Sequence, residues 1–398
     1  MRPQTLVLPG LVAAALCGHG LLQPSLAQES DAAALEGPAP DTQSELIVDA
    51  AEAFLGALSE EQRAAALFDW TDAEQRVRWS NFPLGIFERA GVPWGELNGE
   101  QRTALMDLLG AVLSAEGVQM VREQMAADDI LAAEALVGGD AAGGPDGRGN
   151  GVPPPDGELP EGASPPDGNE QGGPPPGGGG PGGLIFGSAT YYVSFVGEPS
   201  ATEPWMLQFG GHHLGINATV AGPNVSLSPS LTGGQPVSFT VEDESVHIVE
   251  DEVTAAAALI GSMDEAQLGE AVLSAERIDL VLGPGKDGMV LQPEGLPGSA
   301  MTEDQQALLL ALVEARLGML NADDLAARMA EIEAGLSETT FGWWGPTDEP
   351  GAAYWRVTGP TLLLEFSPQE MGGDPSDHLH NMYRDPTNEY GAAWAQVE

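Results

Sequence analysis

Four of the six histidines of this chain form two short clusters, His212-His213 and His378-Leu379-His380. Imidazole is the commonest metal ligand in proteins and the only side chain that normally titrates near neutral pH. A chain with so few histidines that still places them in pairs is expected to use them together. The clusters therefore predict a metal site.

The spacing within each cluster limits which imidazoles can meet. Successive side chains of a β-strand point to opposite faces, so His212 and His213 cannot both reach one site from a regular strand. His378 and His380 can, because they are two residues apart. We predict a site of three imidazoles, two from the second cluster and one from the first. Three histidines with an open position are typical of Zn²⁺, and Cu or Fe are chemically acceptable.

Charged residues near the second cluster are further candidates. Glu365 or Asp377 could complete the metal coordination or fix the tautomer of an imidazole. Arg384 and Asp385 could hold an anionic ligand or fix the C-terminal segment, and we favour the second interpretation. In the alternative without metal, the first cluster bonds to the backbone, and the second pairs with Asp377 and Asp385.

The rest of the sequence suggests a rival function without metal. Trp343, Trp344, Tyr354 and Trp355 could form a carbohydrate-stacking platform, although such groups are more often the core of a hairpin. The chain has no Gly-x-Ser-x-Gly motif, and its Gly-x-Gly-x-x-Gly matches, at 177–183 and 283–288, lie in Gly/Pro-rich stretches that we interpret as the insertion and a turn. His247 lies in an acidic segment and is expected at the surface. The two hypotheses are a metal-binding protein that could act as a metal-dependent enzyme, and a non-metal ligand-binding or structural module of the cell envelope.

The N-terminus has the pattern of a secretory signal peptide. A basic start, Met1-Arg2, precedes an apolar run and then Ser25-Leu26-Ala27, which predicts cleavage after Ala27. Proline and glycine interrupt the apolar run, so we expect no membrane insertion. The mature protein is expected to be secreted or periplasmic. Cys17 is the single cysteine and leaves with the signal, so metal ligands must come from His, Asp, Glu or backbone oxygen.

The charge balance excludes some partners. The chain has 60 acidic and 14 basic residues, for a formal net charge of -46. Such a protein repels nucleic acid and anionic membrane surfaces, which leaves a small molecule or a metal as the expected ligand. The acidity has two interpretations, adaptation to high salt or ordinary solubility of an exported protein, and the near absence of lysine favours the first.

Four helix starts share one pattern, in which an apolar residue precedes a capping residue and glutamine follows three positions after the cap. They are Leu58-Ser59…Gln62, Leu97-Asn98…Gln101, Met263-Asp264…Gln267 and Met301-Thr302…Gln305. This is the capping-box arrangement. The second start of each pair follows a similar turn, Gly91-Val92-Pro93 or Gly295-Leu296-Pro297. These matches, in the same order, predict an internal duplication.

Strand-like sequence follows each helical part. Aromatic and β-branched residues bounded by Gly and Pro predict hairpins. The predicted strands are 190–196, 205–209 and 213–220 in the first copy and 339–344, 354–358 and 361–366 in the second. We predict an α+β fold in which a unit of helices followed by hairpins is duplicated, with both halves packed as one large domain.

The predicted organisation divides the chain into seven segments. They are a signal peptide (1–27), a disordered tail (28–45), the helices (46–137) and hairpins (184–254) of copy 1 around a disordered Gly/Pro-rich acidic insertion (138–183), and the helices (255–336) and hairpins (337–398) of copy 2. The insertion interrupts one copy and is not expected to separate independent domains.

The sequence resembles one family, the bacterial exported proteins of unknown function grouped as DUF3500. The resemblance rests on Gly211-His212-His213-Leu214-Gly215-Ile216-Asn217, on the segment 354–366, and most specifically on the segment 378–391 with its His-Leu-His and Arg-Asp-Pro motifs. It covers roughly residues 46–394, apart from the insertion. One departure lies at 228–236, where the family more often ends in Gly-Ala-Asn-Pro. The family implies no activity.

Overall fold

The computed structural model describes residues 41–141, 184–241, 243–370 and 374–394. These residues all belong to one unit, Gly37–Glu398. The predicted signal peptide, and the part of the predicted insertion after Ala141, lie outside the described residues.

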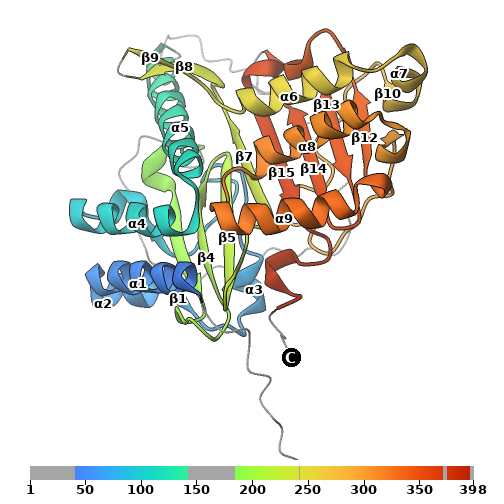
Figure 1. Ribbon diagram of the computed structural model, residues 1–398. Helices are drawn as coiled ribbons and strands as arrows, with labels where there is room; N and C mark the ends of the chain where they lie inside the picture. The colour runs from blue at the N-terminus through green and yellow to red at the C-terminus, as the bar shows by residue number, and fades with distance from the viewer. Residues whose placement is uncertain (1–40, 142–183, 242, 371–373, 395–398) are drawn as a thin grey trace, which may run out of the picture. The chain divides into compact units, whose positions relative to one another are not determined.

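Helices cover one face of a large sheet (Figure 1). In the first half they are α1 (Thr42–Ala57), α2 (Glu60–Ala66), α4 (Gly99–Val112) and α5 (Ala115–Ala141). In the second half they are α6 (Glu250–Gly261), α7 (Glu265–Ala271), α8 (Glu303–Leu317) and α9 (Ala322–Ala334). The short α3 (Ala73–Arg76) packs against the sheet separately, through the hydrogen bond that Gln75 donates to Gln208. No helix in the described ranges combines the length and the apolar character that crossing a membrane requires.

All four predicted capping boxes are present, at the N-termini of α2, α4, α7 and α8. The capping glutamines also bond to one another in pairs. Gln101 Nε2 donates to Gln62 Oε1 over 2.8 Å, and Gln305 Nε2 donates to Gln267 Oε1 over the same distance. The cap residues therefore also fix the two helices of each pair against each other.

The described residues form a thirteen-stranded mixed sheet, with a separate hairpin of β8 (Ser238–Val241) and β9 (Glu244–His247). The first half gives β1 (Leu67–Phe68), β2 (Val92–Pro93), β3 (Tyr192–Val196), β4 (Trp205–Gly211), β5 (Leu214–Ala221), β6 (Asn224–Ser226) and β7 (Ser230–Gly234). The second gives β10 (Val272–Ser274), β11 (Leu296–Pro297), β12 (Thr340–Trp344), β13 (Tyr354–Thr358), β14 (Leu363–Pro368) and β15 (Leu379–Arg384). The α+β class is confirmed.

The main strand order is β1-β3-β4-β5-β7-β15-β14-β13-β12-β10. Its two halves are arranged alike, since each runs from one edge to the centre of the sheet. Each edge strand is parallel to its neighbour, and β2 and β11 add antiparallel to β3 and β12. Leu113, two residues before α5, and Leu320, two residues before α9, form an antiparallel bridge with each other. Two halves related by an approximate two-fold would bring equivalent residues together in this way. The origin by duplication stays a prediction.

The central strands β7 and β15 are not among the predicted strands. The β7 sequence Ser-Leu-Thr-Gly-Gly is poor in residues that favour strands, and β15 carries polar side chains on both faces. Their antiparallel pairing joins the two halves into one sheet. Leu379 and Tyr383 of β15 belong to the main core, and Met382 belongs to a smaller cluster with Trp79 and Tyr390.

Some element boundaries differ from the predicted ones. Helix α1 begins at Thr42, inside the tail predicted to be disordered, because Asp41 and Ser44 form a further capping box. Helix α6 begins at Glu250, earlier than the predicted start at 255. Acidic residues occupy its first turn, where their negative charge interacts favourably with the positive end of the helix dipole.

Substitution of Gly233 tests whether β7 and β15 need the close approach that the structure shows. A Cβ at this position would lie 2.1 Å from the Leu379 carbonyl oxygen of β15. We expect Gly233→Ala to destabilise the protein by about 1–3 kcal/mol through overpacking. Gly269→Ala in α7 is the matched control, because its Cβ would contact nothing within 4 Å, and it should stabilise by about 0.5–1 kcal/mol. Denaturant unfolding measures both, and equal effects would contradict the prediction.

Candidate metal site

His213 lies in the turn between β4 and β5. Gly211 pairs with Leu214, so His212 and His213 form a two-residue hairpin loop. His213 has a φ of 61°, a left-handed conformation that costs on the order of 1 kcal/mol in a residue other than glycine. Histidine is one of the residues enriched there. Strain of this kind is concentrated at functional sites, and here it sets the direction of the His213 side chain.

The second cluster enters the site from the centre of the sheet. His380 lies on β15 between Ser367 of β14 and Gly233 of β7. His378 immediately precedes the strand, after a short 3-10 helix (Pro375–Asp377). Because Leu379 points into the main core, the side chains on either side of it are directed to the opposite face, as the spacing predicts.

The structure brings His213, His378 and His380 together, and we call them the histidine triad. One ring nitrogen from each lies within 4.8 Å of the others. The Nε2 atoms of His213 and His378 are 2.8 Å apart, the distance of an N–H···N hydrogen bond. All three residues are buried, with relative exposures of 3%, 8% and 7%. Tetrahedral Zn–N bonds of about 2.0–2.1 Å place ligand nitrogens ~3.4 Å apart, so a metal would need only a small separation of this pair.

Burial keeps His213 and His380 neutral. The pKa of His213 is held well below its usual value, by burial first and then by the neighbouring imidazoles. The pKa of His380 is lowered well below the usual value by burial and then by His378 and His212. Neutral imidazole is the form that binds a metal, so the environment that disfavours protons prepares both residues as ligands.

His212 does not turn toward the triad with its neighbour. Its Nδ1 lies 2.8 Å from Asp128 Oδ1 of α5, and its backbone carbonyl accepts a hydrogen bond from the Tyr191 hydroxyl over 2.7 Å. Its ring packs on His213, with centroids 3.7 Å apart. His212 therefore supports the triad through ring contact and is itself held by a buried carboxylate. One residue of the first cluster joins the second cluster, as predicted, but the two histidines lie in a turn and not in the regular strand on which the prediction is based.

Asn81 is a site residue that the sequence analysis misses. Its Nδ2 lies 3.1 Å from His380 Nε2, and its backbone carbonyl accepts from the His213 amide over 3.3 Å. Asn81 thus touches residues of both clusters. Asp128 is absent from the predicted site as well. Both contacts join segments far apart in the chain, and neither residue carries a recognisable motif.

Two predicted carboxylates lie outside the group of ligand atoms that the triad forms. Glu365 is fully buried, accepts from the backbone amides of Val281 and Leu282, and accepts from the Tyr354 hydroxyl over 2.6 Å. Asp377 accepts from the Val237 amide over 2.9 Å. Both side chains hold neighbouring segments in place through these bonds, and neither is part of the group that the three histidines form.

The Arg-Asp pair after β15 also lies outside the triad. Arg384 is buried and forms an ion pair with Glu389 over 2.5 Å, and it donates to the carbonyls of Leu282 and Gly283. Asp385 lies 3.2 Å from an Arg328 nitrogen. These contacts fit the favoured interpretation, in which the pair fixes the C-terminal segment.

The comparisons with known proteins agree with the resemblance seen in the sequence. No curated protein and no solved structure matches the chain. The family model described as a protein of unknown function (DUF3500) matches residues 41–392. The match spans both histidine clusters and nearly every described residue, and the chain therefore belongs to the DUF3500 family.

Proposed function

We propose that the protein binds a divalent transition metal ion through the histidine triad, with zinc as the first candidate and copper or iron as acceptable alternatives. The observation that carries the proposal is the convergence of three buried imidazoles whose ring nitrogens lie within 4.8 Å of one another. Residues from both halves of the sheet supply them. Imidazole nitrogen suits all three metals, and the chain beyond its predicted signal offers no thiolate that would compete.

Three protein ligands leave a coordination position for water or a substrate. This arrangement is typical of catalytic zinc sites, whereas structural zinc sites usually have four protein ligands. We therefore propose a metal-dependent enzyme as the function to test first. The N-terminal sequence pattern supports export, so the metal would be acquired in a secreted or periplasmic setting.

The aromatic cluster that suggested the rival function, carbohydrate binding, is buried. Trp343, Tyr354 and Trp355 are fully buried, and Trp344 is 8% exposed. Trp343 pairs with Trp355 and Trp344 with Tyr354 across the β12–β13 hairpin. These rings are core residues and offer no face to a carbohydrate, so the aromatic cluster gives no support to a sugar-binding module.

Metal content tests the proposal directly. We expect purified protein incubated with excess zinc and then desalted to retain about one ion per chain, as measured by elemental analysis. His378→Ala should lose the ion because it removes one of three ligands. His247→Ala is the matched control, since His247 is exposed in the β8–β9 hairpin. Equal metal content in the two variants would contradict the proposal.

The two adjacent histidines of the first cluster should differ. His213→Ala removes a triad residue and should abolish the metal-induced rise in stability, which is about 2.7 kcal/mol at a metal concentration a hundredfold above the dissociation constant. His212→Ala removes only a supporting ring and should weaken binding by about tenfold to a hundredfold. Thermal melts with and without zinc measure both effects. A larger loss in His212→Ala would show that the wrong imidazole has been assigned.

The pH dependence follows from the lowered pKa values of His213 and His380. Because the folded protein disfavours their protonation, protons compete with metal only at a pH below the usual imidazole range of about 6.5. Without metal, the stability contributed by these neutral side chains should be fully present above that range. It should fall as pH decreases, with a slope of up to about 1.4 kcal/mol per pH unit for each proton that only the unfolded chain takes up. Urea unfolding between about pH 8 and 5, with and without zinc, checks both statements, and a metal effect already lost at about pH 6.5 would contradict them.

A further inference from the structure

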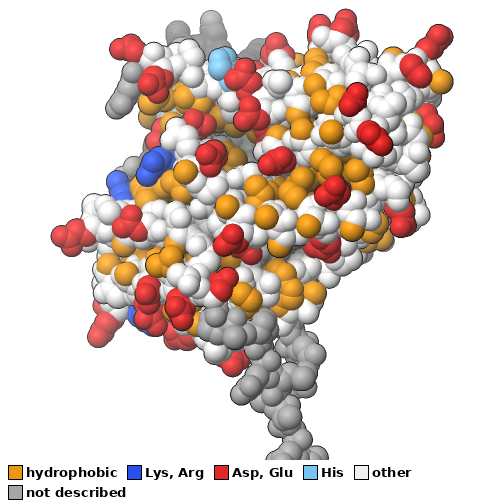
Figure 2. Space-filling model, viewed as in Figure 1, with side chains coloured by type: hydrophobic (Ala, Val, Ile, Leu, Met, Phe, Trp, Pro, Cys, Tyr) orange, Lys and Arg blue, Asp and Glu red, His pale blue; other side chains and the backbone are white. Residues whose placement is uncertain are grey.

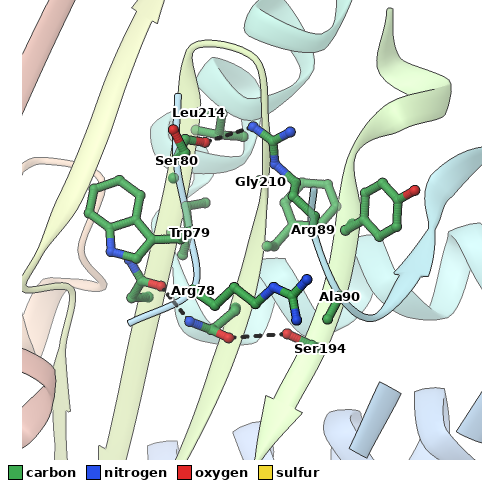
Figure 3. A pocket seen from close by; sticks show the side chains of 14 residues that line it. Arg78, Trp79, Ser80, Arg89, Ala90, Ser194, Gly210 and Leu214 are labelled. Atoms are coloured by element: carbon green, nitrogen blue, oxygen red, sulfur yellow. Dashed lines mark hydrogen bonds between the residues drawn. The ribbon is translucent and has the colours of Figure 1, made fainter. Parts of the chain in front are cut away.

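A polar pocket lies between the segment 78–90 and the strands β3, β4 and β5 (Figure 3). Two guanidinium groups line it, Arg78 and Arg89, together with the polar side chains of Ser80, Ser194 and Gln208. In Figure 3 the Arg78 side chain extends toward Ala90, and Arg89 lies next to Ser80. We call this site the arginine pocket.

The charge of the arginine pocket is opposite to that of the protein. None of the described residues that line it is Asp or Glu, although the chain has 60 acidic and only 14 basic residues. The face in Figure 2 shows carboxylates spread over its surface and few cations. A larger groove between α5, α6 and α8 follows that pattern, with six carboxylates and one arginine in its lining. A pocket lined by two arginines and by no acidic residue is therefore an exception in this strongly acidic protein.

Neither arginine forms an ion pair with a carboxylate within the described part of the chain. The arginines that do so there are Arg63, Arg277, Arg328, Arg356 and Arg384. Arg78 donates instead to the Glu88 backbone carbonyl over 3.3 Å. A guanidinium group that is largely removed from water without an ion-pair partner is costly, and Arg89 is the more buried of the two arginines that line the pocket.

Arg89 is the stronger of the two anchors. Its Nη2 atom donates to the carbonyls of Ser80, Phe82 and Gly211 over 2.6–2.8 Å, whereas its Nη1 atom is shielded from solvent and has no hydrogen-bond partner in the described structure. Burial lowers the pKa of Arg89 to about 10, with weaker opposing effects from neighbouring acidic groups. The guanidinium is thus fixed in position by three carbonyls and still has donor capacity.

We propose that the arginine pocket binds a small oxyanion, a carboxylate or a phosphate of a few heavy atoms. Arginine presents paired N–H donors that match the oxygens of either group. The cavity of about 20 Å³ is partly open to the surface, so it can take the oxygens of a small ligand whose remaining atoms lie at the opening. Arg78 is exposed and can move to admit it. The acidic surface repels anions in general, so binding should depend on this one site.

The arginine pocket is adjacent to the histidine triad in the chain. Ser80 and Leu214 line the pocket, and the residues next to them are Asn81 and His213. The three carbonyl bonds of Arg89 also hold the 80–82 loop against the end of β4, which keeps Asn81 at His380. An oxyanion bound here is a candidate for the acidic group of a substrate that reaches the triad. The oxyanion site itself does not depend on metal binding.

The experiment uses the full chain after chelator treatment and dialysis, so that its outcome is independent of the metal site. Sodium acetate and sodium phosphate are titrated by calorimetry at constant ionic strength, with sodium chloride as the background salt. We expect saturable binding of at least one oxyanion. Acetate binding alone would identify a carboxylate ligand, and phosphate binding alone would identify a phosphate ligand.

Matched variants decide whether the arginine pocket is responsible. Arg78→Gln should weaken binding by about tenfold or more, because it removes a charged hydrogen-bond donor. Arg78 is exposed and lies outside the core, so the variant should fold normally. Arg89→Lys should also weaken binding while keeping the charge, and circular dichroism will establish whether it folds. Arg122→Gln on the exposed face of α5 should bind like the unchanged protein. Absence of saturable binding by both oxyanions, or unchanged binding by Arg78→Gln, would overturn the proposal.

Discussion

The pairing of β7 with β15 is the contact on which the rest of the structure depends. It is the contact at which the two half-sheets join, and it requires a close approach that Gly233 permits because it has no side chain. Strand β5 also touches β7, at the pair Gly215–Leu231. The β4–β5 turn is thereby held near β15, so His213 meets His378 and His380 only when the halves are joined. Both the histidine triad and the joined sheet therefore require the pairing of β7 with β15.

Strand β15 connects two polar environments on opposite faces of the sheet. His380 belongs to the triad, while the next residue, Asn381, donates to Glu252 of α6 over 2.9 Å. Burial raises the pKa of Glu252 to about 7, although the Arg316 charge and the bond from Asn381 oppose the rise. Fully buried polar groups stabilise a fold only when their bonds are made. The helix layer therefore contributes to the placement of β15 and, through β15, to the geometry of the triad.

Local rules predict most of the periphery and much of the site, but not the centre. The capping boxes and aromatic hairpins follow from residues close together in the chain. The contribution of His378 and His380 follows from residue type and from the two-residue alternation of a strand, whereas His213 is placed by a tight turn. Asn81 and Asp128 escape prediction because they reach His380 and His212 across 299 and 84 residues. Strands β7 and β15 escape it because pairing in the middle of the sheet, and not their own propensity, makes them strands.

The arginines show how a strongly acidic chain uses its few cations. Arg356 and Arg384 are buried and pair with Glu294 and Glu389, so they join segments outside their own strands. A planar guanidinium suits this role better than an ammonium, because several acceptors can share it in fixed directions. Surface carboxylates, by contrast, repel one another and are screened by salt. The positions of cations in such a protein are therefore more informative than those of acids. A pocket with two guanidinium groups and no carboxylate stands out for the same reason that a pair of histidines does, since a scarce residue type has been placed twice at one site.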